Sequence, residues 1–243
     1  MNLFKDLVPG RVVTGRPSSY NRRMINFSHV YKTYTGPVHA LKNIDLQIEK
    51  GEFVFLTGPS GAGKTSLFKL ISAFDLPSSG NLQVAGLDLN QLKNKDLPYF
   101  RRRIGVVFQD FKLLKDRTVF ENVALPLQLR GDRPQNLRKR VQEILDQVGL
   151  LHRADHRPDL LSGGEQQRTA IARAIIHQPG ILIADEPTGN LDPRLTEEII
   201  DLFERVSAQG TTVFIATHDH EMVKRRNKRT VEITDGEIIS HGA

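Results

Sequence analysis

The sequence predicts an α/β fold in which helices cover both faces of a mainly parallel β-sheet. Three apolar runs, residues 53–56, 181–184 and 212–216, have the length and the β-branched or aromatic composition of buried strands. Segments with helix signals separate them, and this alternation is typical of parallel sheets. A glycine-rich loop directly after the first run is a second, independent indication of such a fold.

The residues before the first strand differ from the rest in composition. Residues 1–23 mix Gly, Pro and Ser with five basic residues and one acidic residue, and so hold +4 of the net charge of +6. Because they lack helical or strand periodicity, we expect a flexible basic extension, with contact to anionic lipid as the alternative interpretation. The folded domain is expected over residues 24–243, and Met24 is an alternative start of translation.

The first part of the domain is expected to be rich in short strands. Turns that contain Gly and Pro divide residues 24–57 into strand-length pieces. A helix is expected over residues 64–73, and a Pro-Ser-Ser-Gly turn at 77–80 leads into a hairpin-like region. Residues 104–108 are a further candidate for a buried strand.

Between residues 115 and 178 the apolar pattern changes to the helical period. Two S/T-x-x-E capping boxes, at 118–121 and 162–165, mark helix N-termini within this region. One more helix is expected after Asp192, which is a favourable N-cap residue followed by proline at the first helical turn.

The glycine-rich loop at residues 58–65 fits the pattern G-x-x-x-x-G-K-[ST] at every fixed position. Its glycines allow the backbone to fold into a nest whose N–H groups point at one anion. Lys64 adds positive charge for the outer phosphates, and the Thr65 hydroxyl is placed to bind Mg²⁺. The loop therefore predicts that the chain binds a nucleoside triphosphate. The expected nucleotide contacts are Gly58, Pro59, Ser60, Gly61, Ala62, Gly63, Lys64, Thr65 and Ser66.

Two carboxylates, Asp185 and Glu186, follow the apolar run 181–184. Ligands of open α/β sheets bind at the carboxyl ends of the strands, where the phosphate loop also begins. We therefore expect Asp185 to be the outer partner of Mg²⁺. Glu186 is expected to be the general base that polarises the water attacking the γ-phosphate.

The run Leu-Ser-Gly-Gly-Glu-Gln at residues 161–166 is a second candidate anion site. Ser162 is expected to cap a helix whose first residues are glycines, so that unobstructed N–H groups and the helix dipole favour negative charge. From the pattern alone, an ordinary capped helix is an equally good interpretation.

The composition excludes several classes of function. The chain has no cysteine, which excludes disulfides, thiolate metal sites and a cysteine nucleophile. No apolar stretch reaches the roughly 18 residues of a membrane span, and no secretory signal is expected, so a membrane role would come through a second polypeptide. His152 and His156 lack the glutamate of a zinc-protease motif, and the run 218–220 is too short to predict a metal site.

The order of these motifs resembles that of the ATP-binding cassette (ABC) ATPases over about residues 24–240. The resemblance is carried by Gly58–Thr65, Gln109, Leu161–Gln166, Asp185–Glu186, Gly189–Asp192 and His218. It implies a P-loop NTPase of ABC type with an antiparallel β subdomain. It also implies a helical subdomain, at about residues 115–178, inserted in the catalytic core.

The resemblance implies roles for single residues of the hydrolytic site. Glu186, His218 and Gln109 would act in catalysis, with Gln109 in a glutamine loop and His218 as a switch histidine. Thr65, Gln109 and Asp185 would hold the Mg²⁺ ion. The implied cofactors are therefore ATP and Mg²⁺, and the implied reaction is hydrolysis of ATP to ADP and phosphate.

The resemblance also implies a homodimer in which ATP is sandwiched between the two subunits. Ser162, Gly164 and Gln166 would contact the nucleotide that the partner subunit binds. The ring of Tyr34 would stack on adenine. A helix N-terminus from a second subunit would close the open side of the γ-phosphate and exclude water.

Residues 97–127, and 116–123 in particular, are similar to the branch of the family that acts in bacterial cell division. This implies an integral membrane partner, a peripheral position on the cytoplasmic face of the membrane at the division septum, and control of cell-wall hydrolysis. Lipoprotein release and macrolide or peptide export are the alternatives. A soluble ATPase that acts on nucleic acid is less favoured, because the chain has one cassette and no room for a coiled coil between residues 64 and 162.

Apolar residues that follow Gln109 suggest a surface for the membrane partner. Phe111, Leu113, Leu114 and Phe120 are expected either to form a groove for a helix of that partner or to pack the helical subdomain. The basic runs 101–103 and 138–140 are expected to be solvated, with an acidic partner or lipid headgroups as the alternative.

Overall fold

A computed structural model describes residues 22–34, 36, 39–189 and 191–242 of the chain. Nearly all of the expected basic extension, residues 1–21, lies outside the described residues, as does Asn190 next to the expected helix N-cap. The division of the chain into an extension and a domain therefore stays a prediction.

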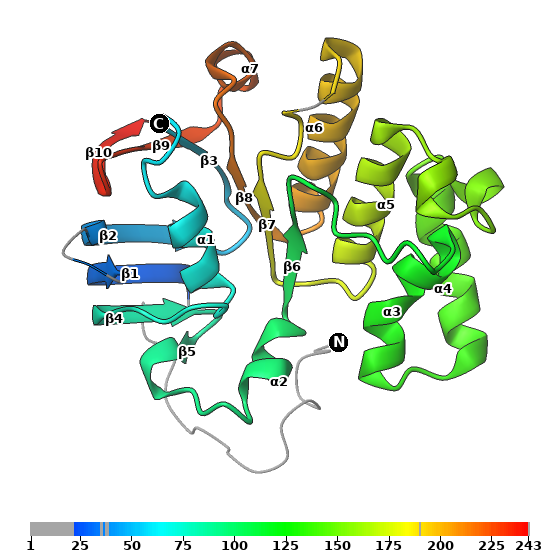
Figure 1. The fold of residues 1–243 in the computed structure, drawn as a ribbon, viewed down its shortest axis with the longest axis horizontal. Coiled ribbons are helices and arrows are strands. Elements are labelled where there is room, and N and C mark those ends of the chain that lie inside the picture. Colours follow the sequence, from blue (N-terminus) through cyan, green and yellow to red (C-terminus); the bar gives the residue numbers. More distant parts are fainter. Residues whose placement is uncertain (1–21, 35, 37–38, 190, 243) are drawn as a thin grey trace.

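A six-stranded sheet lies at the centre of the molecule (Figure 1). Its order is β10-β9-β3-β8-β7-β6, and all neighbours pair in parallel except β10 and β9. The strands are β3 (Phe53–Thr57), β6 (Ile104–Val107), β7 (Ile181–Asp185), β8 (Thr212–Ala216), β9 (Arg229–Thr234) and β10 (Glu237–Gly242). The mainly parallel sheet that the apolar runs predicted is confirmed.

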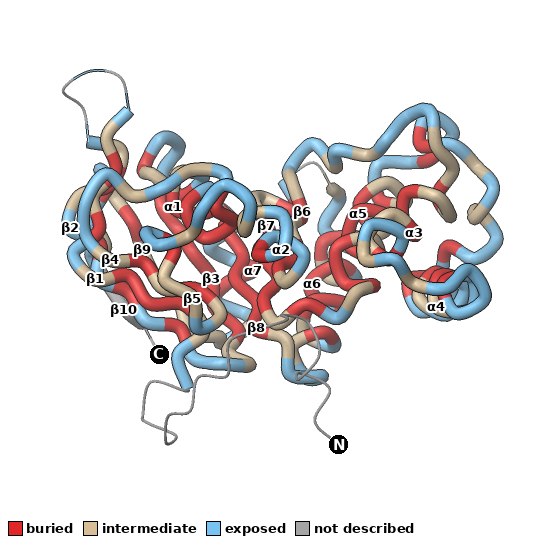
Figure 2. The backbone as a smooth tube through the Cα atoms, turned by 90° about the horizontal axis from the view of Figure 1, so that it is seen from below, coloured by how far each residue is buried: buried red, intermediate tan, exposed pale blue. Residues whose placement is uncertain are grey.

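Strand β3 shows why the central strands are apolar at nearly every position. Phe53 and Phe55 belong to one core cluster, whereas Val54 and Leu56 belong to another. Successive side chains of a strand face opposite sides of the sheet, so a strand buried on both faces has no polar face. The side chains of β7 and β8 also alternate between the two core clusters. Figure 2 shows these buried strands at the centre of the molecule.

The two faces of the sheet are covered by different parts of the chain (Figure 1). One core cluster joins the sheet to α3 (Val119–Arg130), α4 (Pro134–Gln147), α5 (Gly163–Ile175) and α6 (Pro193–Ala208). The other joins it to α1 (Lys64–Ile71) and to a second, antiparallel sheet. Both faces of the parallel sheet are therefore covered, as the sequence predicted.

The second sheet has the order β2-β1-β4-β5, and all its strands pair antiparallel. Its strands are β1 (Arg23–Thr33), β2 (His39–Glu49), β4 (Ser79–Val84) and β5 (Leu87–Asp88). β1 and β2 have 11 residues each, so they are longer than the short strands that the turn signals suggested. The antiparallel β subdomain of the ABC type is confirmed.

The region expected to be helical contains α3, α4, α5 and two short 3-10 helices, η3 (Leu151–Arg153) and η4 (Pro158–Leu160). Both capping boxes are formed, by Thr118 at α3 and by Ser162 at α5. Asp192 caps α6 as expected, and its carboxylate accepts a hydrogen bond from the backbone N–H of Leu195 at 3.0 Å.

Three short elements had no strong sequence signal. They are η2 (Leu89–Gln91), α2 (Leu97–Arg101) and α7 (His220–Arg226). None of the helices in the described part of the chain has both the length and the apolar character that a membrane span requires.

Candidate functional site

The glycine-rich loop connects the end of β3 to the first residue of α1, as the motif predicted. Two of its glycines are required by their surroundings. A β-carbon on Gly58, which has φ of +149°, would lie 2.1 Å from the carbonyl oxygen of Ile233. One on Gly63, with φ of +113°, would lie 2.8 Å from the carbonyl oxygen of Ala40. The loop is therefore packed between the antiparallel sheet and the C-terminal strands.

Lys64, the first residue of α1, is buried, with 8% of its surface exposed. Its ammonium group donates hydrogen bonds to the carbonyl oxygens of Gly58 at 2.7 Å and Pro59 at 3.0 Å. It also lies 3.9 Å from Oε1 of Glu186. The chain thus holds the positive charge inside the loop, where an anion bound by the loop would meet it.

The side chains of Thr65 and Asp185 meet although they are far apart in the sequence. The Thr65 hydroxyl donates a hydrogen bond to Oδ2 of Asp185 at 2.9 Å. Burial raises the pKa of Asp185, and the neighbouring charge of Glu186 raises it further, while the bond from Thr65 acts in the opposite direction. A partly desolvated carboxylate beside a hydroxyl is an oxygen donor set that suits Mg²⁺, so these residues fit the ion that the sequence predicted.

Glu186 is held between the loop and the end of β8. Its backbone has φ of +49°, which is rare for a residue with a β-carbon. The backbone N–H of Glu186 donates to the carbonyl oxygen of Ala216 at 3.0 Å. Its Oε2 lies 2.7 Å from Nδ1 of His218, whose side chain is 68% exposed. The two residues therefore form one unit at the ends of β7 and β8.

A cavity of about 590 Å³ joins these groups. It is lined by Ser60, Gly61, Gly63, Lys64, Thr65, Ser66, Gln109, Asp185, Glu186 and His218. Gln109, two residues after β6, is exposed and also lines the cavity. The structure therefore brings together every residue expected to act in catalysis or to hold the metal ion.

Seven residues of the expected nucleotide site do not line this cavity. Three belong to the phosphate loop itself, Gly58, Pro59 and Ala62, and the other four are Tyr34, Ser162, Gly164 and Gln166. Tyr34 is 41% exposed and lies near two cations, with its ring centroid 5.0 Å from Nζ of Lys32 and 5.9 Å from that of Lys69. An exposed ring at this place remains free to contact a planar group.

The loop at residues 161–166 leads into the N-terminus of α5 and is partly exposed. Ser162 and Gly163 are exposed, and a β-carbon on Gly163 would meet nothing within 4 Å. The Ser162 hydroxyl accepts from the backbone N–H of Glu165 at 3.3 Å and lies 2.9 Å from Oε2 of that carboxylate. Gly164 is buried against Leu195. A β-carbon at this position would lie 2.1 Å from Cδ2 of Leu195, so the site has no room for a side chain. The first turn of α5 is therefore open to a ligand from outside the protomer.

Glu165 holds this cap in place. Its Oε2 accepts a hydrogen bond from the backbone N–H of Ser162 at 2.8 Å, and its Oε1 accepts one from Nε of Arg153 at 2.9 Å. The bond from the Ser162 backbone, followed by the Ser162 hydroxyl and Arg153, lowers the pKa of Glu165 to about 2. The carboxylate is thus charged at neutral pH and fixes the conformation of the loop.

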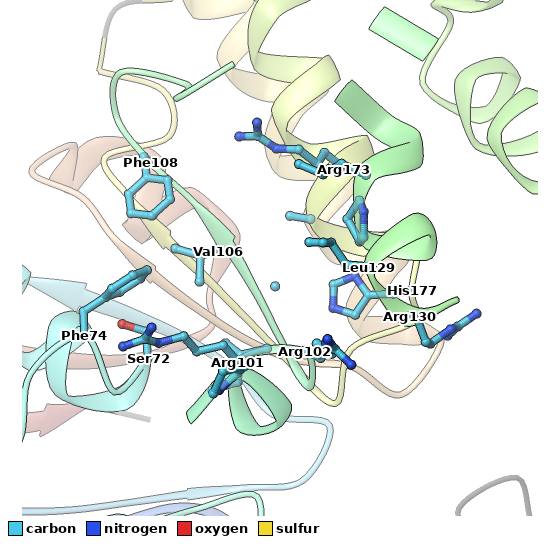
Figure 3. A pocket seen from close by; sticks show the side chains of 16 residues that line it. Ser72, Phe74, Arg101, Arg102, Val106, Phe108, Leu129, Arg130, Arg173 and His177 are labelled. Atoms are coloured by element: carbon cyan, nitrogen blue, oxygen red, sulfur yellow. The ribbon is translucent and has the colours of Figure 1, made fainter. Parts of the chain in front are cut away.

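A second cavity, of about 470 Å³, lies between the core and the helical region (Figure 3). We call it the interdomain groove. Phe74, Val106 and Phe108 line one side, while Leu129 and His177 line the other (Figure 3). Burial lowers the pKa of His177 to about 4, so its ring is neutral at pH 7. The groove is thus mainly apolar, and Arg101, Arg102 and Arg130 also line it.

The apolar residues expected to form a partner groove do not line this one. Phe111, Leu113, Leu114 and Phe120 are all absent from its lining. Phe120 instead packs against the main core cluster, in agreement with the second of the two interpretations.

Other predicted features can also be placed. Arg101 is exposed, donates to the carbonyl oxygen of Ala73 at 2.7 Å and lies 4.8 Å from the ring centroid of Phe74. Among the described residues, no group of three or more His, Asp or Glu side chains is arranged to hold a metal ion. Sequence reasoning missed the groove, because its lining comes from segments that are distant in the chain.

Comparison with known proteins identifies relatives over most of the chain. A family model described as ABC transporter matches residues 41–189. The cell division ATP-binding protein FtsE of Escherichia coli (strain K12) is 49% identical over 219 residues, which are 90% of this chain and 98% of that protein. The protein FtsE of Bacillus subtilis (strain 168) is 50% identical over 216 residues, which are 89% of this chain and 95% of that protein.

Solved structures agree with these matches. The dimeric ATP-binding cassette MJ0796, in a post-hydrolysis state bound to ADP and Pi, is similar with a TM-score of 0.83 and 39% sequence identity. The match covers 90% of this chain and 98% of that one. The protein cbiO1 of Clostridium perfringens, part of the ABC transporter complex cbiONQ, is similar with a TM-score of 0.84 and 31% identity over 91% of this chain and 88% of that one.

Proposed function

Because the chain belongs to the ABC transporter family, we propose that it is the ATP-hydrolysing subunit of a membrane complex of the FtsE type, which acts in bacterial cell division. In this complex the chain is peripheral, on the cytoplasmic face of the membrane at the division septum. An FtsX-like integral membrane subunit transmits its conformational change and so controls cell-wall hydrolysis. About 50% identity to FtsE over nearly the full length of the relatives supports this assignment.

The observation that carries the proposal is the unit of Glu186 and His218 beside the phosphate loop. Glu186 lies in contact with His218 and 3.9 Å from Lys64, in a cavity that the loop also lines. A carboxylate held there is suited to accept the proton of a water that attacks the γ-phosphate. His218 orients the carboxylate, and Lys64 neutralises charge on the outer phosphates.

Mg²⁺ fits the same site. Thr65 and Asp185 present two oxygen donors in contact with each other, and Gln109 adds an amide oxygen at the edge of the cavity. The ion would neutralise charge that develops on the phosphates during hydrolysis. The chain itself positions the donors, since Asp185 ends β7 and Thr65 begins α1.

The dimer follows from where the two anion sites lie. Ser162 and Gly163, at the N-terminus of α5, are exposed, and no residue of the loop at 161–166 lines the cavity around the phosphate loop. If two protomers face each other, the capped helix of one closes the nucleotide site of the other, and water is excluded. The dimeric state of the similar cassette MJ0796 supports this arrangement. Tyr34 stacks on adenine in the same complex.

The interdomain groove is the contact site for the membrane subunit. Its apolar floor and the arginines at its edge are complementary to an amphipathic helix that carries acidic residues. Phe108, which lines the groove, is one residue before Gln109 in the chain. A helix seated there contacts the chain immediately beside the nucleotide site.

The experiment is to purify the chain with and without the membrane protein encoded next to it and to measure ATP hydrolysis. We expect Mg²⁺-dependent activity that the Lys64→Ala variant loses together with nucleotide affinity. Co-purification with a membrane protein supports the cell-division assignment. Stimulation by nucleic acid without a membrane partner would contradict it.

A further inference from the structure

The segment that carries Gln109 has an unusual backbone. Phe111 and Lys112 follow one another with φ of +58° and +47°, although neither is a glycine. The left-handed region is unfavourable for residues with a β-carbon, and two such residues in succession need support from their surroundings. Within the turn, the N–H of Phe111 donates to the carbonyl oxygen of Phe108 at 3.1 Å, and the N–H of Lys112 donates to the carbonyl oxygen of Asp110 at 2.6 Å. The side chains of Lys112 and Asp110 also form an exposed ion pair at 2.5 Å, which is worth little because water surrounds it.

A single side chain supplies the support from outside the loop. Nη2 of Arg173 donates to the carbonyl oxygen of Phe111, and Nη1 donates to that of Lys112, both at 2.8 Å. The guanidinium bonds the two successive carbonyls through two N–H groups held in one plane, a fixed arrangement that the flexible ammonium group of a lysine lacks. In Figure 3 the guanidinium of Arg173 points away from the groove.

Arg173 has no acidic partner among the residues that the structure describes, and its two hydrogen bonds go to these carbonyls. Arg173 is half-buried, and the partial loss of water around it lowers the pKa of its guanidinium. A half-buried cation without a carboxylate partner is stabilised by the carbonyl dipoles that face it. The arginine and the left-handed turn therefore stabilise each other.

The second half of the loop is held separately. Asn122 of α3, which is fully buried, accepts from the backbone N–H of Leu114 at 2.8 Å and donates to the carbonyl oxygens of Leu114, Arg117 and Thr118. This side chain holds residues 114–118 but makes no bond to residues 109–112. The part of the loop next to Gln109 is thus held from outside by Arg173.

We propose that Arg173 is a positioning residue that places Gln109 in the nucleotide site by clamping the backbone at Phe111 and Lys112. The inference rests on the proposed function, since it concerns the hydrolytic role of Gln109. Arg173 lies in α5, whose N-terminus is the loop at residues 161–166, so the clamp ties Gln109 to the helix that faces the partner subunit. The stem of Arg173 also lines the interdomain groove.

The test compares Arg173→Ala, Arg173→Lys, Gln109→Ala and the double variant in the full chain. Arg140→Ala is the matched control, because Arg140 also donates to a backbone carbonyl, that of Ile176 at 3.2 Å, but lies away from the loop. We expect Arg173→Ala to lower kcat about 10- to 100-fold, as is usual when a residue that orients a ligand is lost. Arg173→Lys is expected to retain an intermediate kcat.

The double variant distinguishes positioning from a general structural role. If Arg173 acts through Gln109, the double variant hydrolyses ATP no more slowly than Gln109→Ala alone. Losses that multiply in the double variant, or a wild-type kcat in Arg173→Ala, would overturn the proposal. If Arg173→Ala does not fold, the same comparison with Gln109→Ala is made with Arg173→Lys and its double variant.

A second measurement does not depend on activity. Hydrogen–deuterium exchange of the peptide over residues 109–114 is expected to be faster in Arg173→Ala than in Arg140→Ala. Equal exchange in both variants would refute the clamp even if the chain is an active ATPase. Conversely, a wild-type chain that does not hydrolyse ATP would refute the proposed function while faster exchange still supports the clamp.

Discussion

Nδ1 of His218 lies 2.7 Å from Oε2 of Glu186, and the two residues belong to the ends of neighbouring parallel strands. The histidine is mostly exposed, whereas the side chain of Glu186 is only 13% exposed. The carboxylate of Glu186 thus lies between two basic side chains, with Oε1 3.9 Å from Nζ of Lys64 and Oε2 against the imidazole of His218. Four predictions follow from this site and from the loop at residues 161–166.

Glu186→Gln should lower the turnover of ATP about 10²- to 10⁴-fold, because an amide cannot accept the proton of the attacking water. The amide keeps the shape of the side chain, so ATP binding should persist. An ATP-bound dimer should then accumulate and be visible by size-exclusion chromatography. Turnover at the wild-type rate would show that another residue is the base.

Asp185→Asn should raise the Tm of the nucleotide-free protein at neutral pH. It should also abolish the change in Tm that Mg²⁺-ATP causes in the wild type. Burial raises the pKa of Asp185, so the folded state disfavours the charged carboxylate above that pKa. The asparagine oxygen can still accept from Thr65, so the hydrogen bond is kept. Thermal unfolding with and without Mg²⁺-ATP measures both effects. A lower Tm of the nucleotide-free variant would contradict the prediction.

If the proposed dimer is correct, Ser162→Arg should lower hydrolysis about 10²-fold or more, because it would remove the proposed polar contact to the γ-phosphate of the partner's nucleotide and place a bulky cation at that interface. Each protomer should still bind ATP. Thr118→Arg is the matched control, since Thr118 forms the same capping box at α3, and both variants should lose about 0.5–2 kcal/mol of stability. An active Ser162→Arg protein would argue against the sandwiched dimer.

Glu165→Gln should destabilise the protein in a manner that depends on pH. The pKa of Glu165 is lowered to about 2 from an ordinary value near 4.5, so its charge stabilises the folded state above pH 4.5. This contribution is lost as the pH falls from 4.5 through 2. The Tm difference between variant and wild type, followed by circular dichroism, should shrink over that range. A constant difference would mean that the charge of Glu165 has no part in the cap.

The features that the sequence predicted well are those fixed by neighbouring residues. The phosphate loop, the caps at Ser162 and Thr118, and the start of α6 after Asp192 all depend on local chemistry within a few residues. The buried strands were predictable as well, because a strand covered on both faces has to be apolar throughout.

The features that were missed depend on contacts between distant segments. Nothing near Glu186 or Phe111 in the sequence indicates a left-handed backbone, since in each case the supporting bond comes from another element. The interdomain groove was missed for the same reason. Its walls come from the end of α1, from β6 and from α3 and α5, and no periodic pattern reveals which side chains meet there.

The contact between Gly58 and Ile233 has a consequence for the synthesis of the protein. Ile233 lies on β9, and the N–H of Gly236 in the following turn donates to the carbonyl oxygen of Ala62 at 3.0 Å. The wall behind the phosphate loop is therefore synthesised long after the loop itself. A nascent chain released before residue 236 would lack that wall, so only protein translated past this point acquires a complete nucleotide pocket.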